Sequence, residues 1–310
     1  MLKVSSISTT QDVLDSSGTN LANNTIIWND SANSNYREQF TAIFNAANQT
    51  GQLFGNPRES KKVGGINTEV YTLSTNQADL PMFNFNANIG GVSRGFEIVP
   101  STVENSDSIY ESSPIEGTGL TYTYRSDGSG DSSNNTGFFF LFKQGTIQQT
   151  SFTVDSAITN YIYSIDTPNI NNTDVWLYQL DQFGQITKQW TKVPALSGNN
   201  AIYNSLAKSE RDIYNVVTKL NDQIDLVFGD GNFSNLPLGS FKVYYRSSDN
   251  TKFAIQPNDM QNVVVSVPYI DANGAQQTLS ITLSLQAAVY NAASTESNSS
   301  IKDKAGQVYY

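Results

Sequence analysis

The sequence predicts a mainly β protein with a few helices, an α+β chain in which several small antiparallel β units are joined by loops. Short segments of alternating apolar and polar residues recur along the chain, as expected for half-buried strands. Gly, Asn, Asp and Pro separate these segments, and such residues are typical of turns. Residues 138–142 form a continuous apolar run, which indicates a strand buried on both faces. Helical segments are expected near both the N-terminal and C-terminal ends.

An extended and helical segment is expected over residues 1–60. A helix is predicted to begin after Asn35, because this residue can cap it and Glu38 completes a capping-box pair. The side chains that would share one face of this helix are Tyr36, Phe40, Ile43, Phe44 and Ala47. Such an aromatic stripe is more often ordinary core packing than a groove for a partner, so we interpret it as a core face.

Residues 61–165 are expected to form a β-rich domain of short strands, which ends beyond the apolar run at residues 138–142. Within this domain, Asp127, Ser129 and Asp131 have the spacing that opens a calcium-binding loop. The twelfth position of that loop is Phe138, where a bidentate Glu is needed. We therefore interpret residues 126–136 as a solvated surface loop and expect no metal site.

A third domain is expected over residues 166–310, with an inserted β unit at about 247–284. Residues 175–180 and 186–193 predict one hairpin around an Asp-Gln-Phe-Gly turn. Residues 263–267 and 279–283 predict another, because the Asn-Gly pair between them accepts the backbone angles of a tight turn.

Within this domain, the stretch of residues 226–246 reads LVFGDGNFSNLPLGSFKVYYR. Its two ends alternate as strands, and the segment between them is rich in turn residues, so a hairpin-like pair with a rigid tip is expected. Gly231 stands at a position that is expected to need a positive φ.

The C-terminal residues change from a period of two to a helical period. Leu285, Ala288, Val289 and Ala292 would share one face of a helix, and a second short helix is expected to end near Gly306. This apolar face makes a candidate interface, whose residues are Leu285, Val289, Ala292 and Ile301.

Composition excludes several classes of function. The 310 residues include no His and no Cys, which removes His-based triads, imidazole metal sites and thiol chemistry. The net charge of −10 argues against nucleic-acid binding, and neither an apolar stretch long enough to span a membrane nor a signal peptide is found. The candidate catalytic acids show no paired spacing, so no enzyme activity and no cofactor are expected; these acids are Glu210, Asp212, Asp225 and Asp230.

The FGDG sequence at residues 228–231, the following Pro-Gly turn and the final YYR resemble the baseplate J-like family of contractile-tail proteins. Within that family, the stretch is most similar to the ring-forming baseplate wedge subunits of T-even-type phages, as are residues 136–180 and 285–310. The chain stops before a polar motif that usually follows in the family, so the resemblance implies a central part of a longer subunit. The residues that carry the motif are Phe228, Gly229, Asp230, Gly231, Pro237, Gly239, Tyr245 and Arg246.

The resemblance implies a structural subunit of the tail baseplate wedge, which builds the ring around the central hub and links neighbouring wedges during contractile-tail assembly. Its expected partners are a second copy of itself, as a dimer within the ring, and other wedge proteins. Its expected place is the virion, after assembly in the host cytoplasm. The alternative is a carbohydrate-binding adhesin or receptor-binding module, suggested by the aromatic residues and polar loops on a β scaffold.

Overall fold

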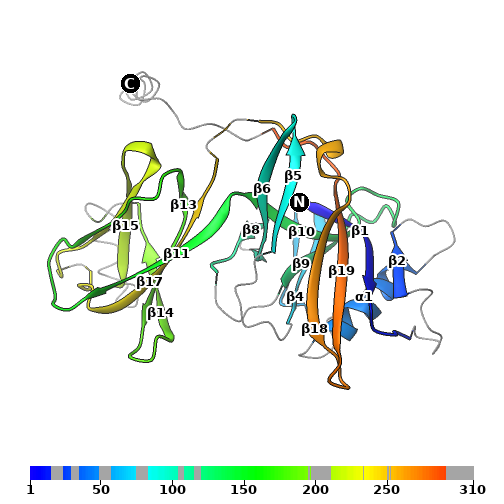
Figure 1. Cartoon of the computed structure of the whole chain (residues 1–310), viewed down its shortest axis with the longest axis horizontal. Helices are drawn as coiled ribbons and strands as arrows, with labels where there is room; N and C mark the ends of the chain where they lie inside the picture. The colour runs from blue at the N-terminus through cyan, green and yellow to red at the C-terminus, as the bar shows by residue number, and fades with distance from the viewer. Residues whose placement is uncertain are drawn as a thin grey trace. The chain divides into compact units, whose positions relative to one another are not determined.

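The computed structural model describes residues 1–14, 24–28, 35–48, 57–74, 83–103, 108–114, 120–194, 196, 211–232, 234–249, 251 and 253–290. The chain divides into two compact units, one comprising Met1–Gln144 with Phe253–Asn291 (unit 1) and the other Gly145–Lys252 with Ala292–Tyr310 (unit 2). Strands dominate both units and most of them pair antiparallel, which confirms the mainly β fold class (Figure 1). The division of the chain differs from the predicted boundaries at residues 60, 165 and 247.

Unit 1 is built on a ten-stranded sheet with a branch. A path of seven strands runs through it, β2 (Thr25–Ile27) pairs with the first strand of the chain, and β6 (Val92–Val99) with β5 (Phe83–Ile89) forms the branch. A separate short pair joins β7 (Ser101–Thr102) to β8 (Tyr110–Glu111). In order along the main path, the strands are β18 (Val263–Ile270), β19 (Gln276–Leu285), β1 (Leu2–Thr9), β10 (Gly137–Gln144), β9 (Leu120–Ser126), β4 (Ile66–Leu73) and β3 (Glu59–Val63).

Strand β10 is the branch point of this sheet. Its first half pairs with β1 and β9, and its second half pairs with β6, beginning at Leu141 opposite Val99. Phe138, Phe139 and Phe140 are all buried, which confirms a strand covered on both faces. Leu141 and Phe142 are half-buried, so only the first part of the apolar run is buried on both faces of the sheet.

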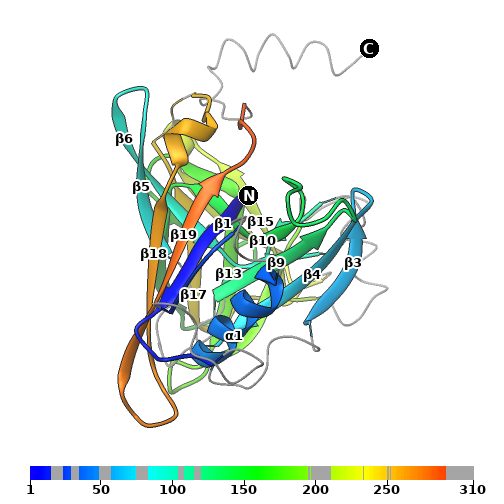
Figure 2. The same cartoon turned by 90° about the vertical axis from the view of Figure 1, so that its right-hand side faces the viewer.

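The predicted helix is present as α1 (Tyr36–Ala47), and its aromatic stripe is buried as expected of core residues. It lies against β9 and β10 (Figure 2). The ring of Phe40 stacks on that of Phe138, with centroids 5.6 Å apart. The predicted capping box is wrong, because the Asn35 side chain makes no capping hydrogen bond. The backbone of Asn35, at φ −121° and ψ 47°, lies outside the extended conformation that a capping side chain needs.

The hairpin of β18 and β19 forms as predicted and is part of unit 1. Asp271 opens its turn by accepting hydrogen bonds from the backbone nitrogens of Asn273 and Ala275, at 2.9 and 2.8 Å. Strand β19 then pairs with β1 from Leu2 opposite Leu285 to Thr9 opposite Leu279. Residues from the two ends of the described chain thus complete one sheet.

Unit 2 is a seven-stranded sheet folded into two layers. The layers are joined through a short parallel contact, in which Thr191 lies opposite Ile213 and Lys192 opposite Tyr214. Trp190 of one layer packs on Phe228 of the other, with ring centroids 5.5 Å apart. In order, the strands are β11 (Thr146–Val154), β17 (Gly239–Ser247), β13 (Ile170–Leu180), β14 (Ile186–Lys192), β15 (Ile213–Thr218), β16 (Ile224–Phe228) and β12 (Ile162–Ile165).

The hairpin of β13 and β14 is confirmed, but the expected pairing of β16 with β17 is wrong. Strand β16 pairs with β12 and β15, whereas β17 pairs with β11 and β13. The two strands belong to opposite layers, and residues 229–238 cross from one layer to the other. An alternating sequence only requires that one face of each strand meets the core, and a two-layer arrangement satisfies that as well as a hairpin does.

The helix expected from Leu285 is also wrong over the described residues 285–290. The N-terminal segment, expected to be extended and helical, begins with strand β1 and contains helix α1. Leu285 is the last inward residue of β19, and the backbone of Val289 exchanges two hydrogen bonds of 2.9 Å with Ile255. A helical spacing over only a few residues also fits the end of a strand followed by an irregular segment. The second short helix expected near Gly306 lies outside the described residues.

The ring cluster around Phe138 predicts where unit 1 is most sensitive. Its side chain is fully buried between Trp28, Phe40 and Tyr124. Phe138→Ala should therefore lower the free energy of unfolding by about 3–5 kcal/mol, because the cavity cannot close. Phe142→Ala, in the half-buried part of the same strand, should cost less than half as much. Urea midpoints test this, and equal losses would contradict the double burial of the strand's first half.

Candidate functional site

The loop of residues 229–238 is held in place by close contacts at its two first glycines. A Cβ at Gly229 would lie 1.8 Å from the buried Oγ of Ser234, so no side chain fits there. Gly231 has a φ of +89°, which confirms the predicted positive φ. A Cβ at Gly231 would also lie 3.2 Å from Cγ of Leu236, so both the backbone angle and the available space favour glycine.

Polar contacts fix the rest of this loop. Asp230 accepts hydrogen bonds from both the backbone nitrogen and the side-chain amide of Asn232, each at 2.9 Å. The guanidinium of Arg211 donates to the carbonyl of Asn232 at 2.9 Å. Asn235 donates from its side chain to Asp212 at 2.9 Å and from its backbone to Arg211 at 2.8 Å. Residues 211–212, which directly precede β15, therefore hold this loop in position through hydrogen bonds.

The remaining motif residues lie at the end of the loop and along β17. Pro237 is buried, and Gly239 starts β17 with a φ of +96°. The ring of Tyr245 is buried, and its hydroxyl lies 2.9 Å from Oγ1 of Thr167. Pro237 and Gly239 therefore lead the chain into β17, and Tyr245 anchors that strand to Thr167.

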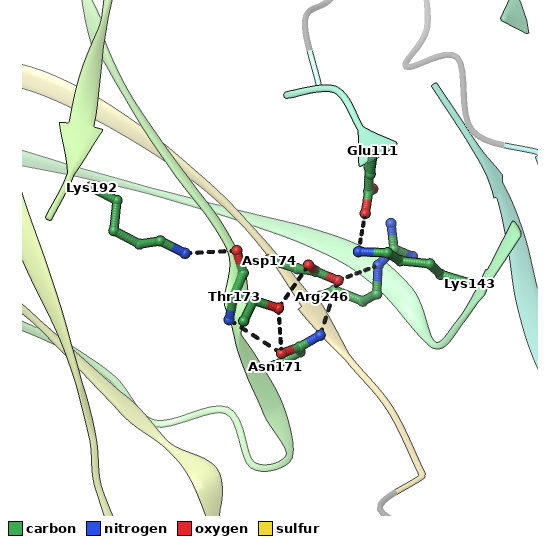
Figure 3. A network of polar contacts seen from close by, with 7 residues as sticks. All are labelled: Glu111, Lys143, Asn171, Thr173, Asp174, Lys192 and Arg246. Carbon is green, nitrogen blue, oxygen red and sulfur yellow. Dashed lines mark hydrogen bonds and ion pairs between the residues drawn. The ribbon is translucent and has the colours of Figure 1, made fainter. Parts of the chain in front are cut away.

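Arg246, the last motif residue, forms a buried ion pair with Asp174. Its Nε lies 3.3 Å from Oδ2 of Asp174, and the two residues are only 1% and 3% exposed (Figure 3). Asn171 donates a hydrogen bond of 3.1 Å to the same carboxylate oxygen, and Thr173 donates one of 3.1 Å to the other. Lys192 in turn donates to the carbonyl of Thr173 at 2.7 Å.

Sequence reasoning singled out Arg246 but missed Asp174. Asn171 and Thr173, which lie directly before Asp174 in the sequence, both donate hydrogen bonds to its carboxylate. The sequence feature that could have indicated this buried charge is the position of Asp174 directly before the apolar Val175–Leu180 segment. Breaking one side of a buried ion pair leaves an uncompensated charge, so the pair constrains how β13 and β17 align.

Figure 3 also shows an ion pair that belongs to unit 1. Nζ of Lys143, at the end of β10, lies 2.7 Å from Oε2 of Glu111, whose side chain is almost fully buried. The contact ties the short strand β8 to β10. Like the pair in unit 2, it joins residues far apart in sequence.

Comparison with known protein families finds one match, a domain of unknown function, DUF8360, over residues 1–288. The chain belongs to the DUF8360 family. The matched range contains the described strands of both units. No curated protein and no solved structure matches the chain.

The candidate catalytic acids of this DUF8360 chain all have local structural partners where they are described. Asp212 pairs with Lys188 at 2.7 Å, and Asp225 accepts a hydrogen bond of 2.6 Å from Ser164. Asp230 binds Asn232, as described above, and Glu210 lies outside the described residues. Among the described residues, the structure brings together no group of three or more His, Cys, Asp or Glu side chains that could hold a metal ion.

The loop with calcium-like spacing is organised by its own side chains. Asp127 accepts hydrogen bonds from the hydroxyls of Ser133 and Thr136 and from the backbone nitrogen of Ser129. These hydrogen bonds, with that of Ser133 the strongest, lower the pKa of Asp127 to about 2. The carbonyl of Asp131 accepts a hydrogen bond of 3.1 Å from the indole of Trp28, so the loop also closes over the aromatic cluster of unit 1.

The two described candidate interface residues, Leu285 and Val289, do not share a helical face. Leu285 is buried in the core of unit 1, and Val289 is half-buried beside Ile255. Ala292 and Ile301 lie outside the described residues.

The geometry of Gly231 gives a testable consequence. Gly231→Val should destabilise the protein by roughly 1–3 kcal/mol, because a β-branched residue at a positive φ is strained and its Cβ would also crowd Leu236. Gly184→Val is a matched control, since its φ is +80° and no heavy atom lies within 4 Å of its Cβ position. Urea denaturation should show the larger loss for Gly231→Val. Coincident midpoints of Gly231→Val and the wild type would refute the tight-turn assignment.

The buried ion pair makes a second prediction. Asp174→Asn should lower the free energy of unfolding by about 3–5 kcal/mol, because it removes the charge of the carboxylate that pairs with the buried Arg246 guanidinium. Asp166→Asn is the control, because Asp166 is 76% exposed in its contact with Lys219 and should matter by less than about 1 kcal/mol. The double variant Asp174→Leu with Arg246→Met should recover much of the loss. Similar midpoints for Asp174→Asn and Asp166→Asn would show that the pair carries no such constraint.

Proposed function

We propose that this chain is a structural subunit of a phage tail baseplate wedge. In this role it helps to build the ring around the central hub and links neighbouring wedges during assembly of the contractile tail. The observation that carries the proposal is the FGDG and YYR motif, which resembles that of the baseplate J-like family. Gly229 and Gly231 of this motif are required by close contacts in their loop, and Arg246 is buried.

The contacts of the motif support a mechanical role. Gly229 and Gly231 allow a loop conformation that side chains would prevent, and Arg246 aligns two strands through Asp174. A subunit that transmits forces between neighbours needs such fixed connections between its strands. The proposal includes no catalytic role, since the described carboxylates considered for catalysis are engaged in ion pairs, turns or hydrogen bonds.

The proposed partners are a second copy of the chain, as a dimer within the ring, and other baseplate wedge proteins. The proposed place is the virion tail baseplate, after assembly in the host cytoplasm. Nucleic acid is not a proposed partner, because the net charge of −10 repels phosphate. The proposal involves no insertion into a membrane; in the described part of the chain, no helix is long and apolar enough to cross one.

No specific observation favours the alternative of a carbohydrate-binding adhesin. A sugar platform requires exposed rings that lie together. Among the described residues, the largely exposed aromatic side chains are Tyr110, Phe183 and Tyr290, which lie in β8, in the turn after β13 and beyond β19. Most other described rings pack into the cores of the two units.

Labelling of intact particles tests the proposed function. Antibodies against the purified chain, applied to contractile-tailed particles shown by mass spectrometry to contain it, should place gold at the baseplate. Antibody pre-absorbed with the chain is the control. Gold on the fibres or head would contradict the proposal, and specific micromolar binding on a glycan array would favour the adhesin.

A further inference from the structure

One face of the unit 1 sheet carries a block of small hydroxyl side chains at its centre. In β18, β19 and β1, alternate residues such as Val265, Ile281 and Ile7 point into the core. The residues between them therefore point to the opposite side. With β2, these four strands lie side by side (Figure 1). Two adjoining rows of their outward residues, together with Thr278, define the hydroxyl face; beyond it, the outward residues of β18 and β19 are Pro268, Ile270, Gln276 and Ser284. Its members are Val264, Ser266, Thr278, Ser280, Thr282, Ser6, Ser8, Thr25 and Ile27.

The strand register arranges this face in rows. Val264 lies opposite Thr282, Thr282 opposite Ser6, and Ser6 opposite Ile27. The next row contains, in the same strand order, Ser266, Ser280, Ser8 and Thr25. Val264 and Ile27 are 57% and 53% exposed, whereas the hydroxyl residues between them are half-buried in the sheet surface. The first row thus has apolar ends and a hydroxyl centre.

The hydroxyl face contains no charged residue among its members. On the same side, Lys3 is only 4% exposed, and its ammonium donates to the carbonyl of Ser133 at 3.1 Å. The chain carries a net charge of −10, so most contacts between two copies would bring like charges together. The hydroxyl face avoids that repulsion, which favours a second copy of the chain as its occupant.

We propose that the hydroxyl face is the surface through which two copies of this chain pair. A two-fold axis parallel to the strands, between β19 and β1, brings each row against the same row of the second copy. Val264 of one copy then meets Ile27 of the other, twice in each dimer, and Ser280 meets Ser8. This isologous contact rests on the proposed function in that it supplies the self-association of the ring subunit.

The size and the edge of the face agree with this arrangement. The four strands, which are eight, ten, eight and three residues long for β18, β19, β1 and β2 and lie about 4.8 Å apart, present roughly 500 Å² on their outward side. Two such faces bury about 1,000 Å², at the lower limit for a specific interface, so the dimer should be concentration-dependent. The edge strand β18 contains Pro268, which lacks a backbone N–H and disfavours extension of the sheet by another edge.

Sedimentation velocity of the full chain across a dilution series tests the face. The wild type should show a monomer–dimer equilibrium, and Ser280→Glu should weaken it by about tenfold or more, because the charge is buried against a neutral neighbour. Ser151→Glu, on an exposed position of β11, should leave the equilibrium unchanged. Ser8→Lys provides a second variant on the face, and urea midpoints show that each variant is folded.

Mixing two variants tests the symmetry. Ser280→Glu mixed with Ser8→Lys should form a heterodimer more strongly than either variant pairs with itself, because residue 280 of one copy meets residue 8 of the other. A wild type that remains monomeric, or a dimer that Ser280→Glu leaves intact, would overturn the proposal. These outcomes are independent of the labelling of the baseplate, so failure of the face and failure of the proposed function can be told apart.

Discussion

The backbone pairing of β1 with β19 is the constraint on which unit 1 depends. It joins residues 2–9 to residues 279–285 and thereby completes the sheet whose inner face forms the largest core. The apolar residues of β18 and β19 have no other place in that core, since β19 is held between β18 and β1. The sheet is therefore completed by two segments that most of the described chain separates in the sequence.

The whole described part of unit 2 lies between β1 and β19 in the sequence. Its first and last strands, β11 and β17, are neighbours, and Thr146 lies opposite Ser247. Entry and exit are thus side by side, which is the usual condition for inserting one compact unit into another. At the entry, Gly145 has a φ of +89°, and a Cβ there would lie 2.2 Å from the carbonyl oxygen of Ser247. The close approach of the two connections requires glycine at this point.

Local signals predicted those parts of the fold that local interactions determine. Helix α1 and the hairpin tip at Asp271 were predictable because their periodicity or turn chemistry involves neighbouring residues. At the site, the same was true of the positive φ of Gly231. The pairing of β1 with β19, the separation of β16 from β17 and the partner of Arg246 were not predictable, because each depends on which distant strands become neighbours. Alternation specifies an inward face but not the strand beside it.

The register of β1 with β19 also determines how unit 1 responds to tension. Leu2 and Leu285 lie at the same end of an antiparallel ladder, so a pull across them separates the hydrogen-bonded pairs one after another. Such peeling needs less force than sliding two strands lengthwise, which strains all their hydrogen bonds together. The inserted strands lie outside the path of that force until β1 has left β19. Unit 2 is therefore shielded from a load applied at these two residues for as long as the ladder remains closed.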